Sequence, residues 1–368
     1  MIGKKSLEEI TAALRSSGSP RGRALVGFDG FVDRLVRLVK SQRDPPDYFE
    51  SIGDFSTFLQ NYPGKSMDMV IRRTDEKVGG NGPLMAESLA VKNVKTCCIG
   101  AFGYPDIIDV FKPLEKICTV VSVEQAAFDL SLEFNDAKIM LGETESFDRI
   151  DWERIIAVMG EENYFSRVSE SDIIGITNWS GLPNSNNILK GFLQSFCPRL
   201  SGGKKIMFID LSDPSCKTEE QFAEFFELLK ELSAVFNIIL GLNAKETVFA
   251  YNRFFQRQEE LFTEEMVTKL AEAMPVTEVV AHGTDWALAS EGKNEYKSIK
   301  GTKIANPKVL TGAGDNFNAG YCLGKIYALD MTACLYLGNI SASLYVKNGK
   351  PAGLSEVIAY IENFLLEE

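Results

Sequence analysis

The chain has 368 residues, of which 45% are hydrophobic and 24% charged, fractions that are ordinary for a globular protein with a sizeable core. Its formal net charge of -12 argues against nucleic acid as a main partner, because nucleic-acid binding calls for basic surfaces. No stretch approaches the ~20 consecutive apolar residues that span a bilayer, so no membrane partner is expected.

The cysteines and the first residues predict a cytoplasmic protein. The seven cysteines are odd in number and include no C-x-x-C motif, which indicates reduced thiols rather than a disulfide framework. Residues 1–15 alternate charged and apolar side chains and lack the apolar core of a signal peptide. The single histidine, His282, excludes a His-rich metal site and disfavours a Ser-His-Asp triad, so any general base is expected to be a carboxylate.

Short apolar runs alternate with amphipathic stretches along most of the chain. The runs predicted as strands are 24–28, 96–100, 172–177, 205–211, 235–240, 278–281 and 286–290. The stretches predicted as helices are 83–92, 219–233, 244–256, 264–274, 315–327, 331–347 and 355–366. Strands that are apolar throughout and alternate with helices predict an α/β fold with a mostly parallel sheet. Ligands bind beyond the carboxyl ends of such strands, so polar residues at those ends deserve inspection.

Two regions interrupt this alternation. Residues 41–77 carry turn signals and scattered aromatics, and residues 130–141 form a predicted hairpin around Asn135-Asp136. Together they predict a small β lid over the strand ends, approximately residues 30–77 and 128–142, within a single domain spanning 1–368. A lid with exposed apolar strands would allow a homodimer through the lid, and this alternative stays open.

Two aspartates follow the first predicted strand, in the segment Gly27-Phe28-Asp29-Gly30-Phe31-Val32-Asp33. Carboxylates accept hydrogen bonds in a directed way, which suits neighbouring sugar hydroxyls. The place of Asp29 and Asp33 at a strand end favours this binding role. A turn with solvated acids is the alternative.

Further polar residues lie at other predicted strand or helix ends. Gly80 and Asn81 precede a predicted helix, where glycine allows close approach of a ligand and Asn81 either contacts that ligand or caps the helix. Asn243 and Glu246 would hold Mg²⁺ waters beside a phosphate, or form a capping box, and the two interpretations are compatible. His282 fits a structural role better than a catalytic one.

The segment 311–320 is the most informative part of the chain. Gly312, Ala313 and Gly314 come directly before Asp315 and an apolar helical pattern. Backbone N–H groups at a helix N-terminus, together with the helix dipole, favour a phosphate. A carboxylate such as Asp315 is unfavourable beside a phosphate, because like charges repel, so Asp315 is expected to have another task. The natural task is to take a proton from a hydroxyl that attacks the phosphate.

Other glycine-rich motifs fit this segment less well. A dinucleotide fingerprint needs a third glycine where Phe317 stands, and a Walker P-loop needs Lys-Ser/Thr where Asp315-Asn316 stand. A glycine turn whose aspartate caps the next helix is the plain structural alternative.

The order of these motifs resembles that of the ribokinase-like (PfkB) carbohydrate kinases. The shared elements are a strand-end Asp, a Gly-Gly-Asn turn, an Asn-x-x-Glu segment and Gly-Ala-Gly-Asp near the C-terminus. The resemblance covers nearly the whole chain, and residues 312–320 are its specific part. It implies a three-layer α/β/α ribokinase-like fold with a mostly parallel sheet and a small β lid. It also implies ATP-dependent transfer of phosphate to a sugar or nucleoside hydroxyl, with Mg²⁺.

The resemblance also implies roles for individual residues. Asp315 would be the general base, with Gly312, Ala313 and Gly314 as the anion hole. Asp33 matches the substrate-hydroxyl aspartate, and the implied sugar side includes Asp29, Gly80 and Asn81. The implied nucleotide side comprises Asn243, Glu246, Gly283, Thr311, Asn339 and Ser343, with Glu246 holding Mg²⁺ through water. Asp210 matches the Asp of the family's central Asp-Pro-Asn segment.

The chain departs from the family pattern at several positions. Val309-Leu310 stand where the family commonly has Asp-Thr, which leaves activation by a monovalent cation such as potassium in doubt. Leu84 stands where the family has Asn, so substrate contacts would shift to Asn81. Trp286 and Ala281 replace a common glycine and threonine beside the nucleotide.

The leading hypothesis is a cytoplasmic, ATP-dependent sugar kinase that uses Mg²⁺. The alternatives are a kinase for a nucleoside or a phosphorylated sugar, and a catalytically silent sugar-binding or regulatory homologue. Arg72, Arg73 or Lys77 lining the sugar pocket would favour a phosphorylated substrate, whereas an aromatic slot under the lid would favour a nucleoside. The sequence leaves open which sugar and which hydroxyl are involved.

Overall fold

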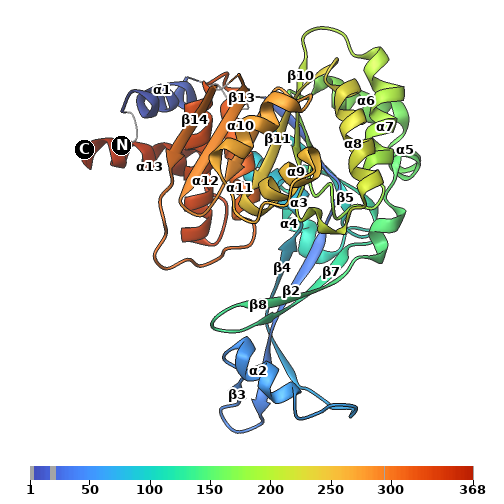
Figure 1. Cartoon of the computed structure of the whole chain (residues 1–368), viewed down its shortest axis with the longest axis vertical. Coiled ribbons are helices and arrows are strands. Elements are labelled where there is room, and N and C mark those ends of the chain that lie inside the picture. Colours follow the sequence, from blue (N-terminus) through green and yellow to red (C-terminus); the bar gives the residue numbers. More distant parts are fainter. Residues whose placement is uncertain (1–3, 17–21, 294, 368) are drawn as a thin grey trace.

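The computed structural model describes residues 4–16, 22–293 and 295–367 and builds two β-sheets from them (Figure 1). Over these residues the larger sheet has nine strands in the order β14-β13-β12-β11-β10-β9-β1-β5-β6. Their bounds are β1 Arg23–Gly27, β5 Lys95–Ala101, β6 Thr119–Glu124, β9 Ile173–Ile176, β10 Lys205–Asp210, β11 Phe236–Asn243, β12 Glu278–His282, β13 Trp286–Gly292 and β14 Glu295–Lys300. Strands β12 to β6 pair in parallel, and β13 and β14 are antiparallel. The carboxyl ends of the parallel strands therefore meet at one edge.

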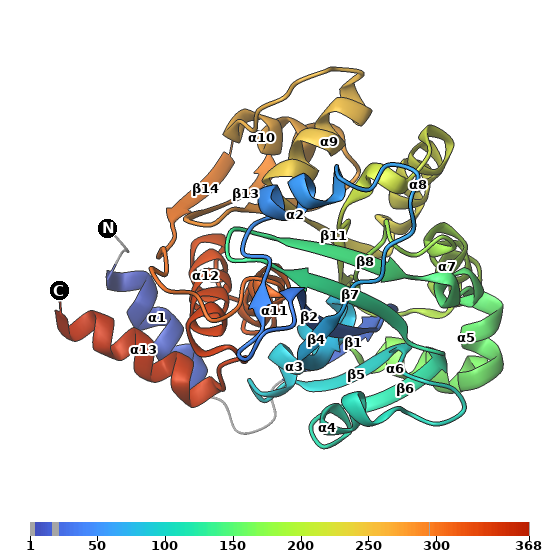
Figure 2. The same cartoon turned by 90° about the horizontal axis from the view of Figure 1, so that it is seen from below.

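Helices cover both faces of this sheet, as Figure 2 shows. Successive strand residues point to opposite faces, so Leu25 packs into one hydrophobic core while Ala24 and Val26 pack into the other. The Leu25 side is covered by α5 Trp152–Met159, α6 Glu161–Glu170, α7 Ser185–Gly191, α8 Glu219–Leu232, α9 Ala244–Phe255 and α10 Glu264–Ala273. The Val26 side is covered by α1 Lys4–Arg15, α3 Asn81–Ala90, α4 Lys112–Glu115, α11 Ala313–Ile326, α12 Met331–Asn348 and α13 Leu354–Glu367. Short helical turns occupy 109–111, 145–149, 192–196, 197–199 and 214–216.

The smaller sheet projects from the body as a lid (Figure 1). It consists of β2 Phe31–Ser41, β3 Asp47–Tyr48, β4 Ile71–Gly79, β7 Ala127–Glu133 and β8 Lys138–Glu143. Strands β2 and β7 pair in parallel and the other pairs are antiparallel. One face packs against α2 (Ile52–Leu59) in a small core of its own, formed by Val36, Leu38, Phe49, Phe55 and Leu132. The opposite face is left for the site described below.

The predicted α/β/α architecture with a mostly parallel sheet and a small β lid is confirmed. Each predicted strand and helix is present, and most bounds agree within about two residues. Helix α3 begins earlier than expected, at Asn81. The interruption at 41–77 is more regular than its turn signals indicate, because it holds α2 and most of β4.

Candidate active site

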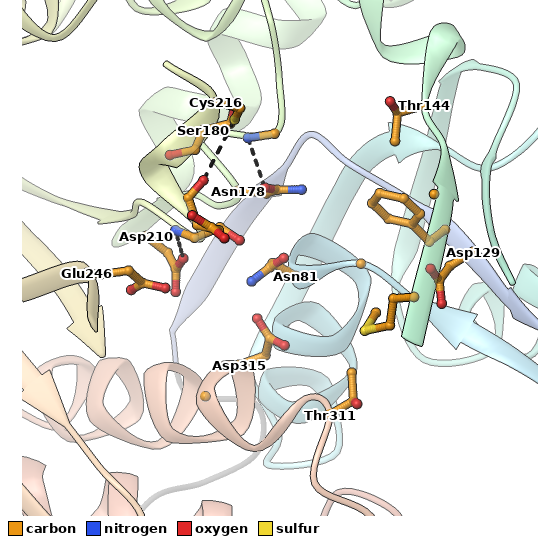
Figure 3. A pocket seen from close by; sticks show the side chains of 18 of the residues that line it. Asn81, Asp129, Thr144, Asn178, Ser180, Asp210, Cys216, Glu246, Thr311 and Asp315 are labelled. Carbon is orange, nitrogen blue, oxygen red and sulfur yellow. Dashed lines mark hydrogen bonds between the residues drawn. The ribbon is translucent and has the colours of Figure 1, made fainter. Parts of the chain in front are cut away.

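A cavity of about 920 Å³ lies where the carboxyl ends of the parallel strands face the lid (Figure 3). The acidic side chains that line it are Asp33, Asp129, Asp210, Asp213, Glu246 and Asp315. Lys217 also lines the cavity, but its ammonium donates hydrogen bonds to the Leu182 carbonyl (2.7 Å) and the Ser185 hydroxyl (3.1 Å). Such an acidic lining suits hydroxyl groups, and it repels a polyphosphate unless a cation accompanies it.

Asp315 is the third residue of α11, is 6% exposed and lines this cavity. Within the described part of the chain, its Oδ1 has no hydrogen-bond partner. Figure 3 shows its carboxylate turned toward Asn81. Burial, with the charges of Asp210 and Asp29, raises the pKa of Asp315 well above its usual range, while a hydrogen bond from Asn81 lowers it. A buried carboxylate made more basic in this way suits the task of accepting a proton.

The loop before Asp315 is shaped for close approach of a ligand. Gly312 has a positive φ of 91°, and a Cβ there would lie 2.7 Å from the Tyr345 hydroxyl and 3.0 Å from Leu84 Cδ1. The Tyr345 hydroxyl donates to the Thr311 carbonyl over 3.0 Å, which fixes the loop. Thr311, Gly312 and Gly314 line the cavity. Glycine is therefore needed where α11 begins. The Ala313 N–H donates to the Leu310 carbonyl over 3.2 Å, and Gly314, the next residue of the helix, lines the cavity, so the N-terminus of α11 faces the space where an anion would bind.

Asp29 lies beneath the cavity rather than in its lining. Its carboxylate accepts hydrogen bonds from the backbone N–H groups of Asn81 (2.8 Å) and Gly82 (2.7 Å) and from Asn178 Nδ2 (2.9 Å). Burial raises the pKa of Asp29, and these donors oppose that rise. The structure thus gives Asp29 a positioning task at the start of α3, and its predicted sugar contact stays a prediction. Gly80 and Asn81, by contrast, line the cavity as predicted.

Asn243 and Glu246 form the capping box of α9 and also line the cavity. The Glu246 carboxylate accepts from the Asn243 backbone N–H (2.8 Å) and Nδ2 (2.5 Å). Asp210, at the end of β10, accepts from the Ser212 N–H (2.8 Å) and Asn318 Nδ2 (2.5 Å). Burial raises the pKa of both acids, and Asp210 raises that of Glu246 further. Both predicted interpretations of the Asn-x-x-Glu segment are therefore compatible with this geometry.

These acids suit a divalent cation that keeps its own waters. In the residues that the structure describes, no group of three or more His, Cys, Asp or Glu side chains is arranged to hold a metal ion directly. Mg²⁺ commonly binds through one or two carboxylates, waters and substrate phosphates. Asp210 and Glu246, buried and mutually repelling, fit this mode because a nearby cation would favour their charged forms.

The lid contributes Asp33 and Asp129 to the cavity, together with Phe31, Met140, Gly142 and Thr144. At its tip, the Lys138 ammonium donates a hydrogen bond to the Thr311 hydroxyl, so the hairpin β7–β8 touches the loop that precedes α11. Arg72 and Arg73 are exposed on β4, and neither they nor Lys77 line the cavity. A phosphorylated substrate would be favoured by basic side chains from this segment in the cavity, and the lining contains none of the three.

The remaining predicted nucleotide-side residues lie outside the cavity lining. Gly283 packs against Trp286, whose Nε1 lies 2.3 Å from the position a Cβ would take. Asn339 accepts from the Thr302 N–H at 3.3 Å, and Ser343 is buried in α12. Ala313 begins α11 next to the lining residues. The structure brings together the phosphate loop, Asp315, Asn243 and Glu246, and leaves nucleotide contacts of the others as predictions.

Several residues that line or bridge the cavity were not predicted from the sequence, among them Asn178, Asp129 and Lys138. Asn178 directly follows the predicted strand 172–177, so the strand-end rule applied there would have found it. Asp129 and Lys138 lie in or beside the predicted hairpin, whose sequence pattern predicts the hairpin itself but not what its side chains contact. Their relevance depends on which face of the lid meets the body, and this is a tertiary property.

Comparisons with known proteins agree with this geometry. A family model described as prokaryotic ketohexokinase matches residues 5–364. A ketohexokinase of Haloferax volcanii is 24% identical over 356 residues, which cover 94% of this chain and 92% of that protein.

Solved structures share the fold at low sequence identity. A ribokinase from Thermotoga maritima has a TM-score of 0.61 and 18% identity, covering 93% of this chain and 100% of that one. An adenosine kinase from Sinorhizobium meliloti has a TM-score of 0.66 and 15% identity, covering 94% and 99%. An Arabidopsis thaliana ribokinase solved with ribose and ATP has a TM-score of 0.64 and 15% identity, covering 93% and 99%. At these identities the likeness shows the fold alone.

Proposed function

Because the chain belongs to the prokaryotic ketohexokinase family of ribokinase-like carbohydrate kinases, we propose that its acceptor is a ketohexose and that Asp315 is its general base. The chain is a sugar kinase that phosphorylates a sugar with ATP. The observation that carries the assignment of the base is the buried, unpartnered Oδ1 of Asp315 beside the N-terminus of α11. The sugar hydroxyl and the γ-phosphate of ATP would meet at this point of the cavity.

The proposed reaction is an in-line transfer. The sugar hydroxyl attacks the γ-phosphorus, its proton passes to Asp315, and the bond to the β-phosphate oxygen breaks to release ADP. Asn81, toward which the Asp315 carboxylate is turned, would position this carboxylate, and Asp29 in turn fixes the Asn81 backbone by accepting a hydrogen bond from its N–H (Figure 3). The N–H groups of Gly312, Ala313 and Gly314 would stabilise charge on the phosphoryl oxygens. Most of the rate would come from positioning and from these fixed dipoles.

Lys138 is proposed to bring positive charge to the transferring phosphate. Its hydrogen bond to the Thr311 hydroxyl places the lid tip beside the phosphate loop. A lysine ammonium is a mobile point charge that suits phosphate oxygens. With the sugar seated between the lid and the strand ends, the same contact would also help to exclude water.

Mg²⁺ is proposed to bind through water to Glu246 and Asp210. When bound, it would neutralise the polyphosphate and offset its repulsion by the acidic lining. The proposed nucleotide side adds Asn243, Thr311, Gly283, Asn339 and Ser343. A role for a monovalent cation stays open, because Val309-Leu310 replace the family's usual residues.

We propose that the protein works in the cytoplasm as a homodimer joined through the lid. All seven cysteines are free thiols, which suits a reducing compartment. In the part of the chain that is described, no helix combines the length and apolar character needed to cross a membrane. Leu141 on β8 is 52% exposed, and a second copy would cover it.

An ADP-release screen tests the proposed function. Wild-type protein with ATP and Mg²⁺ is supplied with ketohexoses, aldoses, sugar acids, nucleosides and their phosphates. The highest kcat/KM is expected for a ketohexose. Asp315→Asn should lower kcat by about 10²–10⁴-fold, because a general base contributes that much, while leaving ATP binding by calorimetry nearly unchanged. Near-wild-type turnover in this variant, or preference for a nucleoside, would contradict the proposal.

A further inference from the structure

The cavity face of the lid carries a second buried carboxylate, Asp129 on β7, beside Asp33 on β2. The two residues are partners in the parallel register of these strands. Side chains of paired residues leave a sheet on the same face as neighbours. Asp33 is 6% exposed and Asp129 is 3% exposed, and both line the cavity. The lid therefore presents two adjacent carboxylates to whatever lies beneath it.

The surroundings of this pair leave its oxygens available to a ligand. The cross-strand row runs Lys77, Asp33, Asp129, Gly142 over β4, β2, β7 and β8. At the Gly142 end, a Cβ would meet nothing closer than Thr144 Cγ2 at 3.6 Å, so space stays open beside Asp129. The Ser131 hydroxyl donates to Asp129 Oδ2 over 2.5 Å and fixes the carboxylate. Among the described residues, nothing donates a hydrogen bond to Asp129 Oδ1 or to Asp33.

A buried carboxylate that accepts too few hydrogen bonds is energetically unfavourable, so this pair requires a ligand that donates hydrogen bonds to it. A phosphate or carboxylate group would be repelled by two like charges at close range. A metal ion is a poor alternative, because the described residues bring no third metal-ligating side chain to the pair. Sugar hydroxyls fit, since each ionised carboxylate accepts several hydrogen bonds. Independently, Asp315 lines the same cavity, and its buried Oδ1 has no hydrogen-bond partner among the described residues, which marks where the reacting hydroxyl would point.

We propose that Asp129 and Asp33 together bind hydroxyls of the acceptor remote from the reacting one, and that Asp129 makes the enzyme selective for a neutral polyhydroxy ketose over sugar phosphates and sugar acids. This inference rests on the proposed function, because it names the substrate class of the same site. Asp33 has Lys77 on its other side and also feels the charge of Lys138, whereas among the described residues Asp129 has the Ser131 hydroxyl on one side and open space at Gly142 on the other. Asp129 therefore supplies the less compensated charge.

The test compares wild-type protein with Asp129→Asn on a ketohexose, its monodeoxy analogues and its monophosphates. The variant should raise KM for the ketohexose roughly tenfold to hundredfold, the range of a charged hydrogen bond, with kcat changed only a few-fold and KM for ATP unchanged. For one of the deoxy analogues, the wild-type KM should be higher than for the ketohexose by a similar factor. With the variant, the KM for that analogue and the KM for the ketohexose should be equal. The preference for the free sugar over its monophosphate should fall at least tenfold. Asp75→Asn, an exposed aspartate on β4 of the same sheet, is the matched control and should match the wild type.

The outcomes separate the two proposals. If wild-type protein releases no ADP with any neutral ketose, the proposed function fails before the variant is needed. If it does, and Asp129→Asn keeps the wild-type KM and discrimination against phosphates, the role of Asp129 is overturned. If that variant does not fold, Ser131→Ala replaces it, because it removes only the hydroxyl that fixes Asp129. A rise in sugar KM of about twofold to tenfold supports the role, and an unchanged KM and unchanged deoxy-analogue profile overturn it.

Discussion

Asp315 shows how a single buried residue acquires a chemical task from its neighbours. Its carboxylate is removed from water, faces the charges of Asp210 and Asp29, and receives one hydrogen bond from Asn81. Burial and the two neighbouring charges favour the protonated form of Asp315, whereas the hydrogen bond from Asn81 and one from the Asp315 backbone oppose them. A group tuned in this way takes a proton readily, and a cation near Asp210 would return it to the charged form. The same arrangement would tie the protonation state of the proposed base to the arrival of the metal-bound nucleotide.

His282 is half-buried beside the phosphate loop, lines the cavity and gives a pH prediction. Its ring packs against Phe317 at 4.7 Å between centroids with the rings tilted by 36°, and a Cβ on Gly314 would lie 3.2 Å from its Cε1. Burial lowers the pKa of His282 from 6.5 to about 4. The folded protein therefore keeps the ring neutral while the unfolded chain protonates it near pH 6.5, so stability is lost as pH falls from about 6.5 to about 4.

The chain's single histidine makes this pH effect measurable. By NMR, the imidazole signals should stay constant from pH 8 to about 5 and move only near pH 4. Against His282→Gln, the wild type should lose on the order of 1–3 kcal/mol of unfolding free energy between pH 7 and pH 4. An imidazole midpoint near 6.5, or parallel stability curves for the two proteins, would show that the ring is solvated instead.

At the scale of elements, helix α9 combines a structural cap with a candidate metal site. Glu246 satisfies the Asn243 backbone N–H at the helix N-terminus, as in any capping box, and also faces Asp210 across the cavity. The cap needs only an acceptor oxygen, whereas binding of Mg²⁺ waters needs the negative charge. The two tasks can therefore be separated by substitution.

Glu246→Gln keeps an acceptor but removes the charge, and Glu246→Ala removes both. We expect Gln to stay within about 1 kcal/mol of the wild type in unfolding free energy, and Ala to lose about 1–2 kcal/mol. Both should raise the Mg²⁺ concentration needed for half-maximal ADP release by about tenfold or more. Thr218→Ala, which opens the capping box of α8, is the control and should lose stability with unchanged Mg²⁺ dependence. If Glu246→Gln needs the same Mg²⁺ concentration as the wild type for half-maximal ADP release, Glu246 serves as a helix cap and not in Mg²⁺ binding.

The body of the fold was predictable because its strands are buried on both faces. The run 24–28 is apolar throughout, and so is the centre of 205–211, at 206–209. Such runs are typical of parallel strands that helices cover on both faces. The lid was harder to predict, because β4 is exposed along most of its length and carries five charged residues between Arg72 and Lys77, interrupted only by Thr74. Nothing in such a sequence distinguishes a strand from a polar loop.

The site was predictable where chemistry follows a strand end in the sequence, as at Asn243 and Asp33. It was not predictable where a residue's function depends on which face of the lid meets the body, as at Asp129. Asp29 illustrates a different limit of prediction from sequence. It stands at a strand end, yet its three donors consume both carboxylate oxygens beneath the cavity. A sequence does not show which of two nearby carboxylates is already satisfied.

At the scale of the whole molecule, the lid projects from the body with its two faces in different environments (Figure 1). The cavity face is acidic, and the opposite face is apolar and is covered at its far end by α2 through Phe55. Nearer the body, Leu141 remains 52% exposed on that apolar face beside Leu130, its partner in the β7–β8 register. Exposed apolar residues on one face of a sheet favour a protein–protein interface there. A second copy of the chain carries the same surface and would cover them in a symmetric dimer.

A dimer formed through this face should be visible by size-exclusion chromatography with light scattering. We expect the wild type to elute as a dimer at micromolar concentration and Leu141→Asp to elute as a monomer, because a buried aspartate without a partner disfavours the interface. Leu261→Asp changes an equally apolar residue that is 79% exposed between α9 and α10, and it should leave the dimer intact. A monomeric wild type, or dissociation by both variants alike, would contradict assembly through the lid. Since the same strands carry Asp33 and Asp129, loss of the dimer should also raise the sugar KM more than the ATP KM.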